Sequence, residues 1–478
     1  MLSDVRAAQA GLPPRSVLNA ALASDLPACH DWEIGHGAME GAVRREAFVF
    51  VCYSDFAGQV RGKGFPFREL DARWERGVGW TPTNIMINCF GNTPVTPWGG
   101  SGDLVLLPDP AGLVELDFSD GGPVERFVLG NVETLDGSPW AVCPRHYLRS
   151  GLAELGAKFG LRLRAAFEHE FTCIGVEPRV GAAYGIEALR SVGDLPEVIL
   201  AQLDAAGLEP ESFHPEFSAG QFEVAVAPAL GIEAADRAVK LRQIVRAACE
   251  RKGLRASFSP IMRKGGVGNG VHIHFSLEDR DGRPVTYDPT RPGGVSEIAA
   301  RFAAGILAHG RALCAITAPS VISYERLRPN AWSASVTNLG PRDREAFIRI
   351  CPVSEKPNTD VSESFNLEFR AADAAATPYM ALGAIVRAGL DGLHREMPLP
   401  VPLSVIDIAR LTEEERRGKG ILPLPASLGE AIVCLEGSGD VLMPEALRAP
   451  YIMHKRAEIA EIADLPPDDV FARYARAY

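Results

Sequence analysis

Four short apolar segments, each carrying ionisable side chains two residues apart, constrain the fold of this chain most. They are AAFEHEFTCIG, AGQFEVAVAP, NGVHIHFSL and FNLEFRAAD, and all lie between residues 165 and 373. Because side chains two apart on a strand project from the same face, each pair is expected to point the same way. The sequence therefore predicts a sheet with one charged face. The paired residues are Glu168 with Glu170, Gln221 with Glu223, His272 with His274, and Glu368 with Arg370.

A charged sheet face of this kind calls for a cation. Burying a carboxylate costs several kcal/mol unless it is paired or metal-bound, and two glutamates on one strand repel each other. Glu216 precedes Glu223 across the turn-prone SAGQ and is expected to return to the same site. Together these positions offer carboxylates and the His272 imidazole, with no cysteine among them. That donor set favours Mg²⁺ or Mn²⁺ over zinc.

Each motif also has an ordinary structural explanation. A single Glu-x-Glu often marks a solvated strand edge, and a single His-x-His often packs or forms a hydrogen-bonded pair. Four such strands in one region favour function, because solvated faces usually mix Lys, Thr and Ser with their acids. The run KGGVGNGVH fits no nucleotide-binding pattern, and is either a tight turn or a backbone that contacts a ligand. The arginines of LGPRDREAFIRI form either a solvated helix face or groups that neutralise a transferring phosphoryl group.

Composition excludes several classes of protein. The 478 residues are 46% hydrophobic, enough for two or three domains. With 49 Lys plus Arg against 61 Asp plus Glu, the net charge is −12, which argues against nucleic acid or an anionic membrane as partners. Nine scattered cysteines without CxxC spacing predict free thiols and a cytoplasmic protein. Neither a signal peptide nor an apolar stretch of about 18 residues is found.

The pattern along the chain predicts three parts. Residues 1–45 form an N-terminal segment, and 46–142 a small, mainly β domain built on the runs AFVFVCY, NIMINCF, DLVLLPD and RFVLGNV. Residues 143–478 form a larger domain in which helices alternate with strands. Within this domain, residues 397–425 are expected to form an exposed excursion. Helices are predicted at residues 146–159, 195–206, 233–252, 296–316, 378–395, 427–435 and 444–462.

Six motifs in order, EHE, HPEFSAGQFE, NGVHIHFS, SYERLRP, RDREAFIR and NLEFR, resemble the glutamine synthetase superfamily. The resemblance implies an α+β fold, with an N-terminal β-grasp domain and a C-terminal catalytic domain whose antiparallel strands form a funnel between helices. It also implies a homo-oligomer, usually a dodecamer of two hexameric rings, whose active sites lie between neighbouring subunits. The implied reaction is ATP-dependent phosphorylation of a side-chain carboxylate, followed by attack of a nitrogen nucleophile on the acyl phosphate.

The resemblance assigns a role to each matching residue of this chain. The ligands of a first metal match Glu170, Glu216 and Glu223, and those of a second match Glu168, His272 and Glu368. The nucleotide contacts match Glu211, His274 and Ser276. The acid substrate contacts match Gly268, Arg326 and Arg370, and the arginines that face the phosphates match Arg344 and Arg349.

Two departures from the family pattern concern the nitrogen donor. Trp332, in RPNAWSAS, stands where ammonia-using members have a Glu, and Thr81, in GVGWTPTN, stands where they have an Asp. Those two acids hold ammonium and remove its proton, so their loss predicts weaker ammonium binding and an amine with an apolar tail. Val267 and Asn366 also depart, the first from an Asn that contacts glutamate and the second from an Arg that faces the nucleotide.

The resemblance thus implies a ligase that joins the γ-carboxylate of glutamate to an amine through a γ-glutamyl phosphate. It would use ATP and two or more Mg²⁺ or Mn²⁺ ions. An ordinary glutamine synthetase that uses ammonium, and a catalytically silent structural or regulatory paralogue, remain as alternatives.

Overall fold

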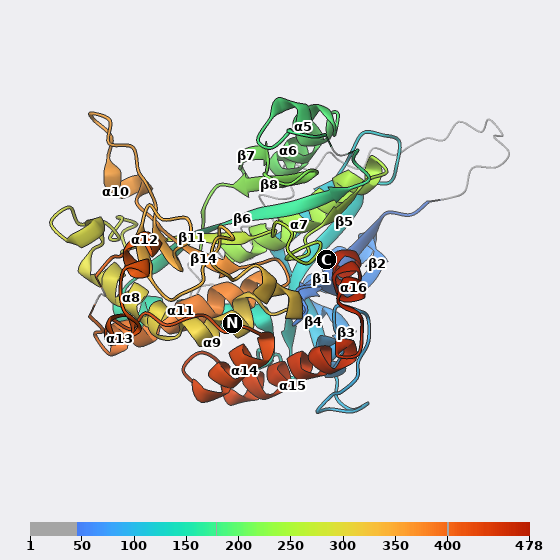
Figure 1. The fold of residues 1–478 in the computed structure, drawn as a ribbon. Helices are drawn as coiled ribbons and strands as arrows, with labels where there is room; N and C mark the ends of the chain where they lie inside the picture. Colours follow the sequence, from blue (N-terminus) through green and yellow to red (C-terminus); the bar gives the residue numbers. More distant parts are fainter. Residues whose placement is uncertain (1–44, 178, 399–400) are drawn as a thin grey trace, which may run out of the picture. The chain divides into compact units, whose positions relative to one another are not determined.

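Two β-sheets with surrounding helices organise the computed structural model, which describes residues 45–177, 179–398 and 401–478 (Figure 1). Both sheets belong to one unit, residues 47–478. The mixture of helices and sheets confirms the predicted α+β class. The segment predicted at residues 1–45 lies, apart from Arg45, outside the described residues.

The N-terminal sheet has five strands in the order β2-β1-β5-β4-β3, and a helix, α3 (Leu70–Arg76), packs against β4. Only β1 and β5 run parallel, and the other neighbours are antiparallel. A parallel central pair with a helix between the flanking strands is the arrangement of a β-grasp domain, as predicted. The strands are β1 (Phe48–Ser54), β2 (Val60–Pro66), β3 (Val78–Trp80), β4 (Leu104–Leu116) and β5 (Glu125–Glu133).

One apolar run of this region is not a strand. NIMINCF begins within the 3₁₀ helix η2 (Pro82–Met86), where Ile85 and Met86 are buried. Pro82 occupies the first turn of η2, where its fixed φ favours a helical start and its missing N–H costs nothing. The apolar side chains at the start of this run therefore pack into the core from a helical turn instead of a strand.

The larger sheet has nine strands, with the main order β12-β13-β14-β11-β6-β8-β7, while β9 and β10 also pair with β6. All neighbours are antiparallel except β12 and β13. The four charged segments form its central strands, as predicted. The strands are β6 (Arg162–Ile174), β7 (Pro210–Pro215), β8 (Gln221–Val226), β9 (Ala229–Leu230), β10 (Arg255–Ser257), β11 (Val271–Glu278), β12 (Leu339–Pro341), β13 (Ile348–Ile350) and β14 (Leu367–Ala372).

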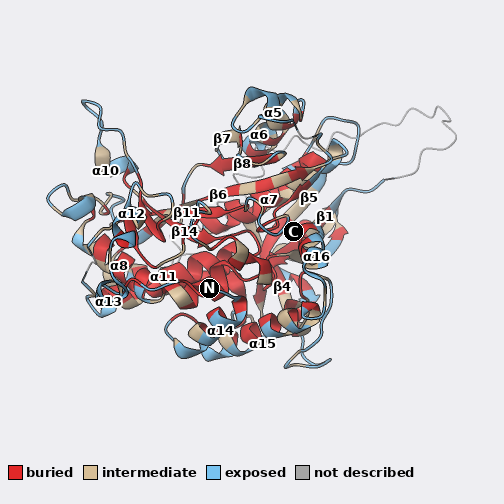
Figure 2. Cartoon of the chain, viewed as in Figure 1, coloured by how far each residue is buried: buried red, intermediate tan, exposed pale blue. Residues whose placement is uncertain are grey.

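Strict alternation along β6 gives this sheet two different faces. From Leu163 to Cys173 every second residue is buried, and the residues between them are partly exposed. The strand contacts helices α4 (Pro144–Phe159) and α7 (Ile232–Arg251), and Figure 2 shows buried and intermediate residues along β6. One face is therefore core, and the other is open to ligands.

The seven predicted helices are all present, but residues 296–316 form two helices, α8 (Glu297–Ala308) and α9 (Gly310–Thr317), that meet at His309. A Cβ on Gly310 would lie 2.7 Å from Thr337 and 3.1 Å from Phe347, so close packing requires glycine at this break. The other predicted helices are α4, α6 (Leu195–Ala205), α7, α11 (Pro378–His394), α14 (Leu428–Gly437) and α15 (Glu445–Ile462).

The sequence patterns did not predict several short helices or the last helix of the chain. The excursion at residues 397–425 carries two of them and is mostly exposed where described, as expected. In the described part of the chain, no helix combines the length and the apolar character needed to cross a bilayer. The elements that the sequence patterns did not predict include α5 (Ile186–Arg190), α10 (Val361–Ser364), α12 (Val405–Ala409), α13 (Glu413–Gly418) and α16 (Pro467–Ala477), with 3₁₀ turns η1 (Phe67–Glu69), η3 (Pro292–Gly294) and η4 (Val321–Glu325).

Candidate active site

Strand register places a row of charged side chains across the open face of the larger sheet. His272 on β11 lies opposite Glu168 on β6, and Glu170 lies opposite Glu223 on β8. On the other side of β11, His274 lies opposite Glu368 of β14. The row thus crosses four neighbouring strands, and the six predicted metal ligands belong to it or to the loop beside it.

Two imidazoles connect these carboxylates. His272 Nδ1 lies 3.4 Å from Glu168 Oε2 and 3.7 Å from Glu368 Oε1, and its Nε2 lies 4.0 Å from Glu170 Oε1. His214 Nε2, on β7, lies 3.2 Å from Glu216 Oε1 and 3.6 Å from Glu223 Oε1. We call the six predicted ligands, Glu168, Glu170, Glu216, Glu223, His272 and Glu368, the carboxylate cluster.

The cluster carries excess negative charge at one end. In the described chain, only histidines form ion pairs with Glu168, Glu170, Glu216 and Glu223. Burial, followed by repulsion from Glu168 and Glu170, raises the pKa of Glu223 to about 9. Carboxylate oxygens that repel each other, with imidazole nitrogens beside them, are a donor set that fits a hard divalent cation.

The glycine-rich run before β11 reaches the cluster with its backbone. Gly270 N donates to Glu170 Oε2 at 2.9 Å, and Gln221 Nε2 donates to the same oxygen at 3.2 Å and to Gly268 O at 2.8 Å. A Cβ on Gly270 would lie 3.1 Å from His272 Nε2 and 3.3 Å from Arg326 Nη1. The run thus contains a tight turn, in which Gly266 N donates to Arg263 O, and its backbone then reaches the cluster, while its contact with a ligand stays a prediction.

Arginines neutralise the opposite end of the cluster. Arg349 Nη1 donates to Glu368 Oε2 at 2.9 Å, and Arg370 pairs with Oε1 of the same carboxylate. Although burial alone would raise it, His272 and Arg370 lower the pKa of Glu368 to about 2. Arg349 lies on β13 and Arg344 in the exposed β12–β13 loop, so the solvated helix face considered for this segment is wrong.

A second arginine network joins the cluster to the loop that follows η4. Arg370 donates through Nε to Arg344 O at 2.8 Å and through Nη2 to Trp332 O at 3.3 Å. Arg326 is buried and donates to Ser333 Oγ at 3.0 Å and to Ala372 O. Trp332 itself has φ 53° and a 65% exposed side chain, so its backbone is tied to the site while its indole stays accessible.

Three predicted residues lie outside this network of described contacts. Glu211 is exposed on β7, at an irregularity in the pairing with β8. Ser276 follows His274 on β11 and pairs with Arg164. Thr81 precedes η2 in the N-terminal sheet region. The roles of these three residues, like those of the other site residues, stay predictions.

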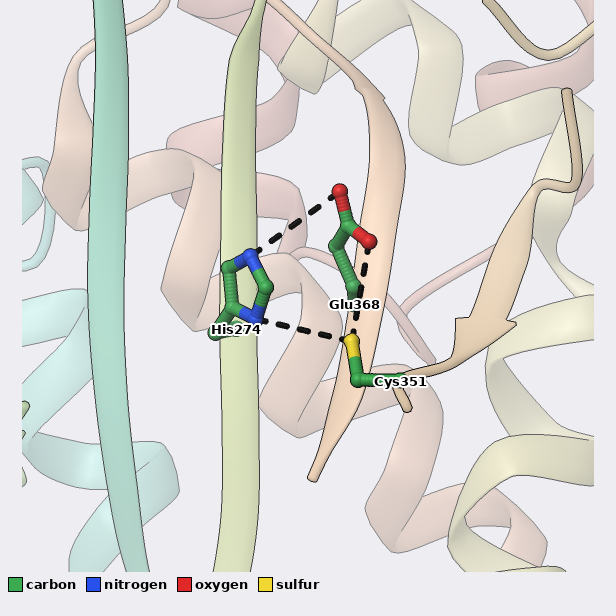
Figure 3. Close-up of side chains that lie close together, drawn as sticks. All are labelled: His274, Cys351 and Glu368. Carbon is green, nitrogen blue, oxygen red and sulfur yellow. Dashed lines mark hydrogen bonds and ion pairs between the residues drawn. The ribbon is translucent and has the colours of Figure 1, made fainter. Parts of the chain in front are cut away.

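The structure also brings in residues that the sequence did not single out. His214 bridges two cluster carboxylates, and the Tyr184 N–H donates to Glu216 O at 3.4 Å. Cys351 Sγ lies 3.6 Å from Glu368 Oε2 and 3.6 Å from His274 Nδ1 (Figure 3). The spacing rule that found the other pairs would have found two of these, since His214 stands two residues before Glu216 and Cys351 two after Arg349. No comparable signal marks Tyr184.

Family models match nearly the whole described chain. The model of the glutamine synthetase catalytic domain matches residues 141–474, and that of the glutamine synthetase N-terminal domain matches residues 36–140. Gamma-glutamylpolyamine synthetase GlnA3 of Streptomyces coelicolor is 36% identical over 447 residues, which cover 90% of this chain and 93% of that protein. Glutamine synthetase of Pyrococcus woesei is 32% identical over 411 residues, covering 84% and 87%.

Solved structures show the same fold. A crystal structure described as a novel glutamine synthase homolog has a TM-score of 0.83 and 39% identity, covering 92% of this chain and all of that one (100%). A complex of GmaS with ADP has a TM-score of 0.75 and 27% identity, covering 88% and 95%.

Proposed function

This chain belongs to the glutamine synthetase family, and on that premise we propose that it joins the γ-carboxylate of glutamate to an amine larger than ammonium. As a family member it is an ATP-dependent carboxylate–amine ligase. The choice of nitrogen donor rests mainly on Trp332, whose backbone carbonyl accepts from Arg370 and whose indole is exposed. The likeness to a gamma-glutamylpolyamine synthetase supports the same class of donor.

The carboxylate cluster has the donors to hold the divalent cations of such a ligase. We assign one ion to Glu170, Glu216 and Glu223, and a second to Glu168, His272 and Glu368. The uncompensated charge around Glu223 supports this assignment, because a bound cation would relieve the repulsion that raises its pKa. When bound, these ions would offset the charge that develops on the transferred phosphoryl group.

Side chains of this protein would position the two anionic substrates. Arg326 is buried beside Gly268 and Gly270, where a guanidinium can hold the carboxylate of an amino acid. Arg349 and Arg344 lie on and before β13, and are assigned to the phosphates of ATP. Binding of ADP by the structural relative GmaS supports a nucleotide site in this fold. Transfer of the γ-phosphoryl group to glutamate then gives γ-glutamyl phosphate, which the amine attacks.

The nitrogen donor must reach the acyl phosphate as a free base. Ammonium has a pKa well above neutrality, so its use requires a nearby anion that binds it and accepts a proton. Trp332 provides no such anion. An indole offers a broad apolar surface for an alkyl or aryl group and a cation–π attraction for an ammonium head. These properties favour an amine with an apolar chain.

Phosphate release with glutamate and ATP tests the proposal directly. We expect at least one primary amine, among alkylamines, aminoalcohols, polyamines and aromatic amines, to exceed ammonium in kcat/KM by tenfold or more. That ratio corresponds to about 1.4 kcal/mol of transition-state preference. Trp332→Glu, combined with Thr81→Asp, should shift the ratio towards ammonium.

Val433→Glu, at a 63% exposed position on α14, is the matched control for an added surface charge and should leave the ratio unchanged. Ammonium as the best donor of the unmodified enzyme would instead establish an ordinary glutamine synthetase, a reading favoured by the Pyrococcus relative. No release with any nitrogen donor would indicate a silent paralogue.

A further inference from the structure

Cys351, His274 and Glu368 place three different metal-ligating groups around one point (Figure 3). Cys351 follows β13, His274 lies on β11 and Glu368 on the intervening β14. The sulfur lies 3.6 Å from His274 Nδ1 and 3.6 Å from Glu368 Oε2. One atom from each of the three residues lies within 4.8 Å of the other two.

The two distances from the sulfur match two edges of a tetrahedral zinc site. With Zn–S near 2.3 Å and Zn–N or Zn–O near 2.0 Å, tetrahedral angles put the sulfur about 3.5 Å from each of the other two donors. We propose that Cys351, His274 and Glu368 bind a thiophilic divalent cation, of which Zn²⁺ is the biological example, and that this ion inhibits the enzyme.

The groups around His274 suit it for this role. Its Nε2 lies 3.2 Å from Glu168 Oε1, so this carboxylate is placed to accept from Nε2 once an ion has taken Nδ1 and the ring proton has moved. Histidines that bind metals usually donate their other ring N–H to a carboxylate in this way. Asn366 Oδ1 lies 2.9 Å from Nδ1, and its amide nitrogen donates to Ser364 O at 3.0 Å. Because an amide oxygen only accepts, Nδ1 donates to it when no ion is bound, and transfer of that proton to Nε2 on metal binding would free both Nδ1 and this oxygen as donors.

Burial and ligand softness separate this site from the hard-ion sites of the carboxylate cluster. Cys351 is 7% exposed and Glu368 is 1% exposed, so the donors are largely shielded from water. A thiolate prefers Zn²⁺ to Mg²⁺, whereas the other cluster residues offer oxygen and imidazole alone. On binding, the thiol proton passes to solvent. The two kinds of ion would therefore select different sets of donors, which share Glu368.

Arg349 and Arg370 do not block Glu368 as a ligand. Each carboxylate oxygen has two lone pairs, so Oε2 can accept from Arg349 and still face the sulfur. Glu368 is also assigned to the second catalytic ion, however, and cannot serve both ions in their full geometry. Occupation of the thiol site should therefore weaken binding of the catalytic ion, which makes the thiophilic ion an inhibitor.

Cobalt(II) tests the site without relying on activity, because a thiolate bound to Co²⁺ gives a charge-transfer absorption in the near ultraviolet. The full-length protein should develop this band on titration with Co²⁺, and Cys351→Ser should lack it. Cys434→Ser removes a half-buried thiol on α14 outside the site and should keep it. The same band in Cys351→Ser, or its absence from the unmodified protein, would overturn the proposal whatever the nitrogen donor proves to be.

Inhibition gives a second and independent measurement. At saturating Mg²⁺, the Zn²⁺ concentration that halves phosphate release should be at least tenfold higher for Cys351→Ser than for Cys434→Ser. In the unmodified protein, Zn²⁺ but not Mg²⁺ should slow alkylation of Cys351, followed by mass spectrometry of its peptide, by tenfold or more. The alkylation measurement uses only the unmodified protein, so it does not depend on the folding of a variant. An alkylation rate that ignores Zn²⁺ would contradict the site.

Discussion

Individual residues of the carboxylate cluster differ in what balances their charge. Glu368 lies between Arg349 and Arg370, whereas Glu223 lies beside other carboxylates and, among the described residues, forms an ion pair with a partly exposed histidine alone, His214. The same substitution at these two positions should therefore have opposite effects on stability, although both residues are assigned to metal ions.

Glu223→Gln should stabilise the metal-free protein and abolish turnover. A carboxyl group whose pKa is raised to about 9 binds a proton in the folded state that the unfolded chain releases above its ordinary pKa. Its contribution to stability is therefore present at low pH and lost as pH rises from about 4.5 to 9, so the gain from Gln should grow over that window. At pH 7.5 we expect a gain on the order of 2 kcal/mol, measured by denaturant unfolding in EDTA.

Glu368→Gln should also abolish turnover but should destabilise the protein. It leaves the buried Arg349 and Arg370 without their anion, a change that costs about 3–5 kcal/mol in comparable pairs. Glu414→Gln, exposed on α13, is the control and should change neither quantity. Equal stability effects at positions 223 and 368 would contradict a site in which arginines balance Glu368 and carboxylates repel Glu223. Full activity in either variant would contradict the assignment of these residues to metal ions.

Gly270→Ala should reduce phosphate release without unfolding the protein. The added methyl group would lie 3.1 Å from His272 Nε2, 3.3 Å from Arg326 Nη1 and 3.4 Å from Glu170 Oε1. Since all three groups are assigned to substrate or metal, a shift of a few tenths of an ångström should lower kcat/KM by roughly tenfold or more. Gly418→Ala, where no heavy atom lies within 4 Å, should be neutral. Unchanged kinetics in Gly270→Ala would separate this glycine from the site.

At this scale, the sequence predicted side chains that share a strand face, and the same spacing also marks the overlooked His214 and Cys351, whereas no spacing marks Tyr184. Glu168 and His272 follow from alternation alone. Tyr184 comes close to Glu216 only because its loop folds back, with φ 53° at Tyr184 itself. Nothing in the spacing of residues encodes such a return, because it depends on tertiary packing.

Among the elements, β6 shows how one strand serves both core and site. Glu168 and Glu170 face the open side, and His169 between them is 1% exposed. Its ring stacks on Phe167 and packs edge-on against Phe258. Burial, and then the charge of Arg242, lower the pKa of His169 to about 3. The strand thus carries a histidine that must stay neutral for the sheet to stay packed.

His169 should make the fold sensitive to mild acid. Because its pKa is about 3 in the folded state and about 6.5 when unfolded, the unfolded chain binds more protons below pH 6.5 and stability falls as pH falls. The loss between pH 8 and pH 5.5 should be about 1.4 kcal/mol. His169→Gln should remove this part of the pH dependence, and His394→Gln, at an exposed position on α11, should not. Parallel pH profiles of all three proteins would refute the assignment.

Long elements with clear periodicity were predictable, whereas short ones were not. Helix α7 was predicted within a residue at each end, since its apolar positions repeat over many turns. Helices α5 and α12 contain too few residues for a period to show. The break between α8 and α9 depends on packing around Gly310, which no pattern within that segment reveals.

The molecule as a whole raises the question of how Thr81 could act at the candidate site. Among the described residues, no hydrogen bond, ion pair or ring contact joins the η2 region, which Thr81 precedes, to Trp332 or to the carboxylate cluster. The family resemblance implies rings in which the N-terminal domain of one subunit completes the site of its neighbour. We therefore propose a ring oligomer with shared sites. Sedimentation should give a particle many times the 51.4 kDa of one chain.

Mixing two inactive variants tests whether the sites are shared between chains. Glu170→Gln removes a metal ligand, and Thr81→Arg places a bulky cation where we expect the amine to enter, so each variant alone should be inactive. If a site takes Thr81 from one chain and Glu170 from the next, random mixing in equal amounts should restore about a quarter of the sites. A site built from one chain would recover nothing, because every chain then carries one defect. Activity in the mixture, absent from either variant alone, therefore requires that neighbouring subunits complete each other.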